Sequence, residues 1–208
     1  MAKKAQKFLV GIDEVGRGPL AGPVAVGVLI VREGFDFTTN DLKGVRDSKK
    51  ILESKRKEIF VKIKKLQQQG ELDFVVNFVS EKQIDKVGIA AAIKMALERG
   101  LNEIMKGMSG KRLADYQIYL DGGLKAPVEF VNQQTVIKGD DKIKVISAAS
   151  IVAKVTRDRR MRVWAKKYPQ YGFDKHKGYG TAEHRRAIKT HGLCPIHRRS
   201  FCKKWIVS

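Results

Sequence analysis

The fold and chemistry of this chain are decided by the stretch FLVGIDEVGRGP at residues 8–19. Its apolar first half predicts a strand, and two adjacent acids, Asp13 and Glu14, stand where that strand ends. Paired carboxylates at a strand end can present oxygens to a divalent cation. In the basic turn that follows, Gly16 and Gly18 let bare backbone come close to a sugar or phosphate. The stretch therefore favours metal-assisted chemistry on a phosphodiester.

Two further acids follow apolar runs in the same way. Asp121 comes directly after the run at 116–120, and Asp140 comes after the run at 135–139. Each of these sites taken alone also fits a simpler role, because acids are common in turns. Asp13 with Glu14 fits a solvated turn or a helix cap, and Asp121 and Asp140 each fit a turn. We favour convergence in one cleft because four acids stand at expected strand ends.

Composition indicates the class of partner. The chain has 42 Lys and Arg against 22 Asp and Glu, a net charge of +20 over 208 residues. This excess suits nucleic acid or an anionic membrane face, because both present dense phosphate. No run approaches the roughly 18 apolar residues of a membrane span, and residues 1–7 do not form a signal-peptide core. The expected partner is nucleic acid, with no membrane attachment.

The cysteines and histidines suggest no metal centre. Cys194 and Cys202 are the two cysteines of the chain, and no Cys-x-x-Cys pair occurs, which fits a reduced, cytoplasmic location. Four histidines crowd the C-terminal fifth at a spacing that matches no zinc motif. We interpret them as part of a basic solvated face. They are His176, His184, His191 and His197.

The remaining patterns predict an α/β fold with a mixed sheet. A continuous β-branched run at 24–31 is expected to pair with the first strand as a hairpin, and 72–79 is a further strand. Helices are expected at 53–69, 89–105 and 145–167, and a last helix between Thr181 and Gly192, with a turn-rich connector at 168–173. Residues 1–167 would form the catalytic core, and 168–208 a basic C-terminal segment of the same domain.

Six ordered motifs resemble one family, type 2 ribonuclease H or ribonuclease HII. They are GIDEVGRGPLAGPV at 11–24, DSKK at 47–50, LDG at 120–122, KGD at 138–140, SAASIVAKVTRD at 147–158 and HKGYGT at 176–181. The resemblance implies an RNase H-like fold, a mixed sheet flanked by helices, with a C-terminal helical segment that grips the duplex. It also implies endonucleolytic cleavage of RNA in RNA–DNA hybrids and 5′ of ribonucleotides embedded in duplex DNA, as in ribonucleotide excision repair. The products would carry 5′-phosphate and 3′-hydroxyl ends.

The resemblance also assigns the four acids. Asp13, Glu14, Asp121 and Asp140 match the family's catalytic residues and would hold two Mg²⁺ or Mn²⁺ ions. All-oxygen ligation suits these hard cations. One ion would activate water for in-line attack and the other would stabilise the leaving 3′ oxygen.

Substrate-binding residues are implied by the same motifs. The loop Gly16-Arg17-Gly18 would sense the 2′-hydroxyl through backbone amides that donate and carbonyls that accept. Tyr179 would pack on the sugar at the RNA–DNA junction; without the resemblance it reads as a partly buried aromatic. Four residues are expected to meet substrate phosphates: Ser48, Lys49, Ser150 and Lys154.

Several assignments stay open. Ser48 with Asp47 also fits an N-cap of the helix at 53–69. Asp158 is left out of the metal set, because it either lies near the site or forms an ion pair with Arg157 or Arg162. We recognise no clamp-binding extension after the segment 200–205, so recruitment by a sliding clamp is undecided, and a monomer is the default.

Two other functions compete with this interpretation. A different two-metal nuclease on the same fold would share the acids but need no 2′-hydroxyl sensor. A non-catalytic RNA-binding or ribosome-associated protein would explain the charge of +20. It would not explain the acids, because carboxylates weaken phosphate binding unless a metal bridges them.

Overall fold

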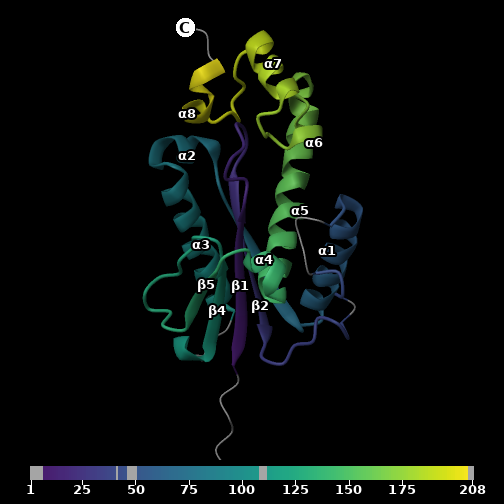
Figure 1. Cartoon of the computed structure of the whole chain (residues 1–208), viewed down its shortest axis with the longest axis vertical. Coiled ribbons are helices and arrows are strands. Elements are labelled where there is room, and N and C mark those ends of the chain that lie inside the picture. The colour runs from purple at the N-terminus through teal and green to yellow at the C-terminus, as the bar shows by residue number, and fades with distance from the viewer. Residues whose placement is uncertain (1–6, 41, 46–50, 108–111, 206–208) are drawn as a thin grey trace, which may run out of the picture.

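A computed structural model describes residues 7–40, 42–45, 51–107 and 112–205, and its centre is a five-stranded mixed sheet (Figure 1). The strands lie in the order β3-β2-β1-β4-β5. Their bounds are Phe8–Val15 for β1, Val24–Arg32 for β2, Leu72–Val79 for β3, Tyr116–Asp121 for β4 and Gln133–Val136 for β5.

Strand β1 lies in the middle of the sheet and sets the register of the acids. It is antiparallel to β2, with Asp13 opposite Gly27, and parallel to β4, with Ile12 opposite Leu120. Parallel strands have their carboxyl ends at the same edge of a sheet. Asp13 and Asp121 each follow that last pair by one residue, so the register places the two acids side by side.

Helices cover both faces of the sheet (Figure 1). On one face, α1 (Glu53–Gln68) and α5 (Lys144–Lys167) bury apolar residues against Leu29 and Val31 of β2. On the other face, α2 (Glu81–Val87) and α3 (Ile89–Lys106) pack on alternate residues of β1 and β2, such as Val10 and Val26. Neighbouring strand residues point to opposite faces, so one strand serves both cores. The sheet is therefore the middle of three layers.

The C-terminal segment extends beyond the end of the sheet. It holds α6 (Phe173–His176), α7 (Ala182–His191) and α8 (Arg199–Cys202), with short 3₁₀ helices η2 (Pro169–Tyr171) and η3 (Lys203–Trp205). These elements form a third apolar cluster with Leu20 and Ala21, which follow the glycine loop. Ala21 also forms a β-bridge with His197. The C-terminal segment is thus joined to the loop that follows β1.

The strands expected at 24–31, 72–79 and 116–120 and the expected helices are confirmed, with their ends displaced by at most one residue, whereas β1 continues three residues beyond the apolar run at 8–12. Thr181 caps α7 as expected, because its Oγ1 accepts a hydrogen bond from the N–H of His184. The interpretation of a strand running up to Asp140 is wrong. β5 ends at Val136, and Asp140 is the second residue of the one-turn helix α4 (Gly139–Lys142). Within the described ranges, none of the helices is long and apolar enough to cross a membrane.

Helix α5 lies against β1 and β2 at two glycines. A Cβ on Gly11 would stand 2.2 Å from the carbonyl oxygen of Val145, and a Cβ on Gly27 would stand 2.5 Å from that of Ala149. Real Cβ atoms do not approach this closely. The first half of α5 is also rich in buried small residues, so helix and sheet meet with backbone against backbone. The glycines fix how near α5 comes to the acids on β1.

We predict that Gly11→Ala and Gly27→Ala each destabilise the protein by about 1–3 kcal/mol, because the added methyl meets helix backbone that cannot move alone. Gly123→Ala is the matched control, since a Cβ there has no neighbour within 4 Å. Urea unfolding at neutral pH measures the three variants. Equal stability of Gly11→Ala and Gly123→Ala would contradict the close approach.

Candidate active site

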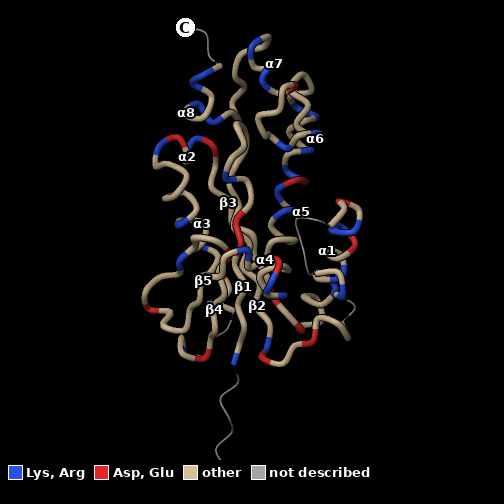
Figure 2. The backbone as a smooth tube through the Cα atoms, in the orientation of Figure 1, with Lys and Arg blue, Asp and Glu red and all other residues tan. Residues whose placement is uncertain are grey.

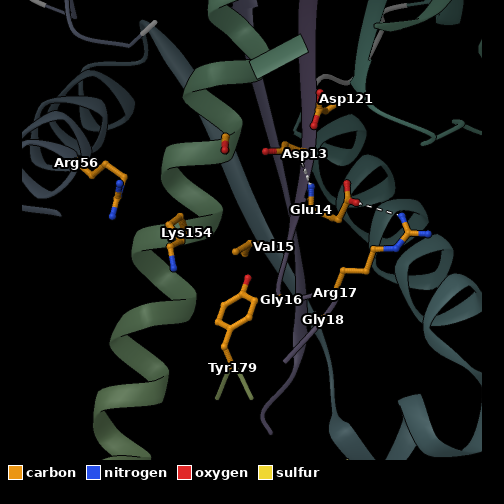
Figure 3. A pocket seen from close by; sticks show the side chains of 11 residues that line it. Asp13, Glu14, Val15, Gly16, Arg17, Gly18, Arg56, Asp121, Lys154 and Tyr179 are labelled. Carbon is orange, nitrogen blue, oxygen red and sulfur yellow. Dashed lines mark hydrogen bonds and ion pairs between the residues drawn. The ribbon is translucent and has the colours of Figure 1, made fainter. Parts of the chain in front are cut away.

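A cleft of about 420 Å³ opens between the end of β1 and helix α5 (Figure 3). Its walls come from five parts of the chain: the β1 end with its glycine loop, helix α1, the end of β4, the middle of α5, and the loop before α7. The lining residues are Asp13, Glu14, Val15, Gly16, Arg17, Gly18, Arg56, Asp121, Ser150, Lys154 and Tyr179. Nine of the residues expected from the sequence are therefore gathered in one place.

Asp13 has a strongly perturbed carboxyl group. It is buried on β1, and its Oδ1 accepts the N–H of Glu14 at 2.8 Å. Burial raises the pKa of Asp13 to about 8, and the charges of Asp121, Glu14 and Asp140 raise it further, while a hydrogen bond from Ser150 opposes the shift. Carboxylates that repel one another in a buried site are arranged to be neutralised by a cation.

Glu14 faces the other side of the cleft. It lies 3.5 Å from a guanidinium nitrogen of Arg17, and this ion pair is drawn in Figure 3. Burial raises the pKa of Glu14, and Arg17 partly offsets that effect. Arg17 is mostly exposed, so the pair is not a rigid constraint.

Asp140 is fully buried. The helix α4 that carries it is tied to β4, because the N–H of Gly139 donates to Asp121 Oδ1 at 2.6 Å. Ser147 of α5 donates from its hydroxyl to the backbone carbonyl of Asp140. Asp140 influences Asp13 electrostatically but does not line the cleft.

The donor set is suited to hard divalent cations. It consists of carboxylate oxygens, the ligands that Mg²⁺ and Mn²⁺ prefer. Among the residues that the structure describes, no three His, Cys, Asp or Glu side chains are already grouped to hold a metal ion. Side chains such as Glu14, now turned to Arg17, would have to rotate on binding.

The basic residues of α5 differ in part from expectation. Lys154 lines the cleft, and its Nζ lies 2.9 Å from Oδ1 of Asp158, so Asp158 pairs with Lys154 and not with the arginines expected. Arg162 instead pairs with Glu53 of α1. Arg157 is buried and donates to the carbonyls of Pro23, Lys177 and Ala21.

Two expected phosphate contacts cannot be placed, and one residue was missed. Ser48 and Lys49 lie outside the described residues. The N-cap position of α1 is Leu52, so the interpretation of Ser48 as the cap of that helix is wrong. Arg56 lines the cleft from α1 although it belongs to none of the recognised motifs. Arg56 stands among several lysines on its helix, and nothing in the sequence pattern distinguishes it from them as a cleft residue.

Comparisons with known proteins give a family match over nearly the whole chain. Residues 10–204 match the family model for ribonuclease HII. The ribonuclease HII of Acetivibrio thermocellus is 43% identical over 206 residues, which cover 99% of this chain and 73% of that protein.

This chain belongs to the ribonuclease HII family. Ribonuclease HII is an endonuclease and a hydrolase that acts on RNA–DNA hybrids and depends on divalent metal ions. The chain has the same overall fold as the crystal structure of ribonuclease H2 from Pyrococcus horikoshii OT3, with a TM-score of 0.69, 28% identity and coverage of 95% and 96% of the two chains. A structure of Bst-RNase HIII in complex with Mn²⁺ is similar in fold, with a TM-score of 0.65, 19% identity and coverage of 89% and 63%.

In this member of the ribonuclease HII family, buried histidines support the loop that carries Tyr179. The interpretation of a solvated histidine face is wrong for three of the four, because His176, His184 and His197 are buried. The rings of His176 and His184 stack with centroids 4.4 Å apart. His191 is exposed on α7, as expected.

The histidines form a directed chain of hydrogen bonds. The N–H of Cys194 donates to Nδ1 of His197 at 2.9 Å, His197 Nε2 and His184 Nε2 are 3.0 Å apart, and His184 Nδ1 lies 2.9 Å from the carbonyl of Tyr179. The chain is consistent when both rings are neutral, with the protons on His197 Nε2 and His184 Nδ1. Burial lowers the pKa of His184 and of His197 to about 4.

We predict that this histidine pair makes the fold sensitive to acid. The unfolded histidines take up protons near pH 6.5 and the folded ones near pH 4, so the stability they contribute is lost as pH falls through this window. The effect is at most about 1.4 kcal/mol per pH unit for each histidine. The raised pKa of Asp13 acts in the opposite direction, so the test compares variants.

Urea unfolding between pH 4 and 7 is the measurement. Relative to wild type, the stability of His197→Gln should depend less on acid, and that of His191→Gln should follow wild type. The interpretation fails if His197→Gln and wild type show the same slope.

Proposed function

We propose that this protein hydrolyses the RNA strand of RNA–DNA hybrids and also cuts 5′ of single ribonucleotides embedded in duplex DNA. The observation that carries the proposal is the joining, in one cleft, of buried acids with the loop Gly16-Arg17-Gly18 and the half-exposed Tyr179. A nuclease that recognised only the phosphates of its substrate would need the acids and the basic side chains. It would not need an open glycine loop or an aromatic ring beside them.

Asp13, Glu14, Asp121 and Asp140 would hold two divalent cations, Mg²⁺ or Mn²⁺. The oxygen-only donor set and the raised pKa of Asp13 support this assignment, as does the Mn²⁺ complex of the similarly folded RNase HIII. Bound divalent cations lower the pKa of attacking water and stabilise charge on the leaving 3′ oxygen. At neutral pH Asp13 must lose its proton to become a ligand, so cation binding is expected to release a proton.

The cations of the chain would hold the duplex. Lys154 and Arg56 face the cleft from α5 and α1, and Lys154 stands opposite Asp13 in Figure 3. Beyond the cleft, Lys and Arg continue along the far half of α5 and over α6, α7 and α8 (Figure 2). Phosphate contacts of this kind position a duplex without reading its sugars. We infer that residues 168–205 extend the grip along the duplex.

The loop and Tyr179 would read the sugar. Tyr179 is 42% exposed, and Figure 3 shows its hydroxyl pointing into the space between α5 and the β1 end. A ring packed on the deoxyribose after the ribonucleotide would select for the junction by shape, since a 2′-hydroxyl there would crowd it. Gly18 has no neighbour within 4 Å of a notional Cβ, so the loop offers open backbone.

Asp13→Asn should abolish cleavage while duplex binding persists. The change removes a charged ligand but keeps the shape of the side chain, and phosphate contacts hold the substrate independently. We expect a fall in rate of at least about a hundredfold, of the size seen when one transition-state electrostatic contact is removed. Asp141→Asn, one residue beyond Asp140 and outside the cleft lining, is the control.

Cleavage and gel-shift assays on the same duplex measure both properties. Near wild-type cleavage by Asp13→Asn would remove Asp13 from the ligand set. Loss of binding along with cleavage would assign it to substrate contact.

Tyr179→Ala should lose activity at a single-ribonucleotide junction by roughly ten- to a hundredfold, because sugar–ring contact is worth roughly 1–3 kcal/mol by analogy with base stacking. Activity on uniform RNA–DNA hybrid should fall less. Tyr179→Phe is the matched variant: it should keep most activity if the ring face matters, and much less if the hydroxyl does. Equal losses of Tyr179→Ala on both substrates would reduce Tyr179 to a structural aromatic.

A further inference from the structure

Arg198 is a fully buried cation at the back of the glycine loop. Its Nη2 donates to the carbonyl of Gly16 at 2.6 Å, its Nη1 to that of Arg17 at 3.0 Å, and its Nε to that of Gly22 at 2.8 Å. Within the described residues it forms no salt bridge, so neutral carbonyls solvate the charge. Burial lowers the pKa of Arg198 to about 9, which leaves the guanidinium charged at neutral pH.

This contact fixes the direction of two peptide groups. A trans peptide is planar, and its N–H points opposite to its carbonyl. The peptide that joins Gly16 to Arg17 turns its carbonyl to Arg198, so the N–H of Arg17 points away from the interior. The next peptide does the same for the N–H of Gly18. Both residues line the cleft, so the two donors face the substrate side.

The two donors are free in the part of the chain that the structure describes. Neither the N–H of Arg17 nor that of Gly18 donates to a protein acceptor there. The carbonyls of Gly16 and Arg17, in contrast, accept hydrogen bonds from the buried guanidinium of Arg198. Because solvent does not reach that guanidinium, losing these two acceptors would leave the buried charge with unsatisfied donors. We expected the loop to offer the substrate both N–H donors and carbonyl acceptors. At these two peptides the carbonyls are already bound to Arg198, so only the N–H groups are available to substrate.

The structure has a second buried guanidinium, that of Arg157, and its carbonyl partners differ from those of Arg198. Arg157 is equally buried and donates to Pro23, Lys177 and Ala21, but to neither Gly16 nor Arg17. A lysine at either position would keep the charge but lose the planar fork that reaches adjacent carbonyls together. Arg198 alone of the two therefore holds the loop carbonyls.

We propose that Arg198 is a positioning residue that sets sugar selectivity: it turns two loop carbonyls inward so that the N–H groups of Arg17 and Gly18 donate to the 2′ oxygen of the ribonucleotide. The inference rests on the proposed function, because it assumes that this loop reads the sugar. It assigns the 2′-hydroxyl the role of acceptor at these two donors. Arg198 touches no substrate in this account.

The test compares affinities of two duplexes that differ at one sugar. One contains a single ribonucleotide and the other is all DNA, and fluorescence anisotropy in EDTA measures both dissociation constants without cleavage. Arg198→Lys should reduce the preference for the ribonucleotide duplex by about tenfold, since each neutral hydrogen bond contributes a factor of about three to ten. Affinity for all-DNA duplex should stay within about twofold.

Arg157→Lys is the control for loss of a buried guanidinium. It should lower thermal stability comparably and reduce the preference much less. If Arg198→Lys keeps the wild-type preference, or if both variants lose it equally, the positioning role is overturned. If wild type itself shows no preference, the sugar-reading part of the proposed function fails, and the inference falls with it.

Amide hydrogen exchange in the wild-type protein gives a test that needs no variant. The amides of Arg17 and Gly18 should exchange rapidly in the free protein. The ribonucleotide duplex should slow both at least about tenfold more than the all-DNA duplex does. Slow exchange in the free protein, or equal protection by both duplexes, would overturn the proposal even if Arg198→Lys did not fold.

Discussion

Helix α5 can lie against β1 and β2 only because Gly11 and Gly27 carry no side chain where the helix backbone passes. Everything in the cleft depends on this close approach. It brings Ser150 within hydrogen-bonding reach of Asp13 and places Lys154 on the opposite wall. It also carries Arg157 into the interior behind the loop. The end of β1 and helix α5 form two facing walls of the cleft, and a spacing wider by one methyl layer would move these walls apart.

Charged side chains are buried on both sides of the glycine loop. On the cleft side, burial first and then the charges of three other carboxylates raise the pKa of Asp13, and a bound divalent cation would favour its charged form. Behind the cleft, Arg157 and Arg198 place two buried cations among backbone carbonyls. Both arginines already have backbone carbonyl partners, and Arg198 is the one that binds the carbonyls of Gly16 and Arg17. The carbonyls of Gly16 and Arg17 are therefore already engaged by Arg198, on the side of the loop away from the cleft.

The sequence was sufficient for the strands, the long helices and most of the site, because apolar periodicity and contiguous motifs are local signals. Asp13, Glu14 and the loop could be found for that reason. Local reasoning failed where a role depends on distant contacts. Arg198 and Gly16 are 182 positions apart, and the three buried histidines come together only when α6, α7 and the segment at 194–197 meet. Asp140 was expected directly at a strand end because a β-branched run does not mark the residue at which pairing stops, and β5 ends at Val136.

The most direct test of the whole account is cleavage of a DNA duplex that contains one ribonucleotide, with an otherwise identical all-DNA duplex as control, each with and without Mg²⁺ or Mn²⁺. We expect a single cut 5′ of the ribonucleotide that requires the metal and leaves 5′-phosphate and 3′-hydroxyl ends, and no cut in the all-DNA duplex. Cleavage of both duplexes at similar rates, or cleavage that persists in EDTA, would contradict it.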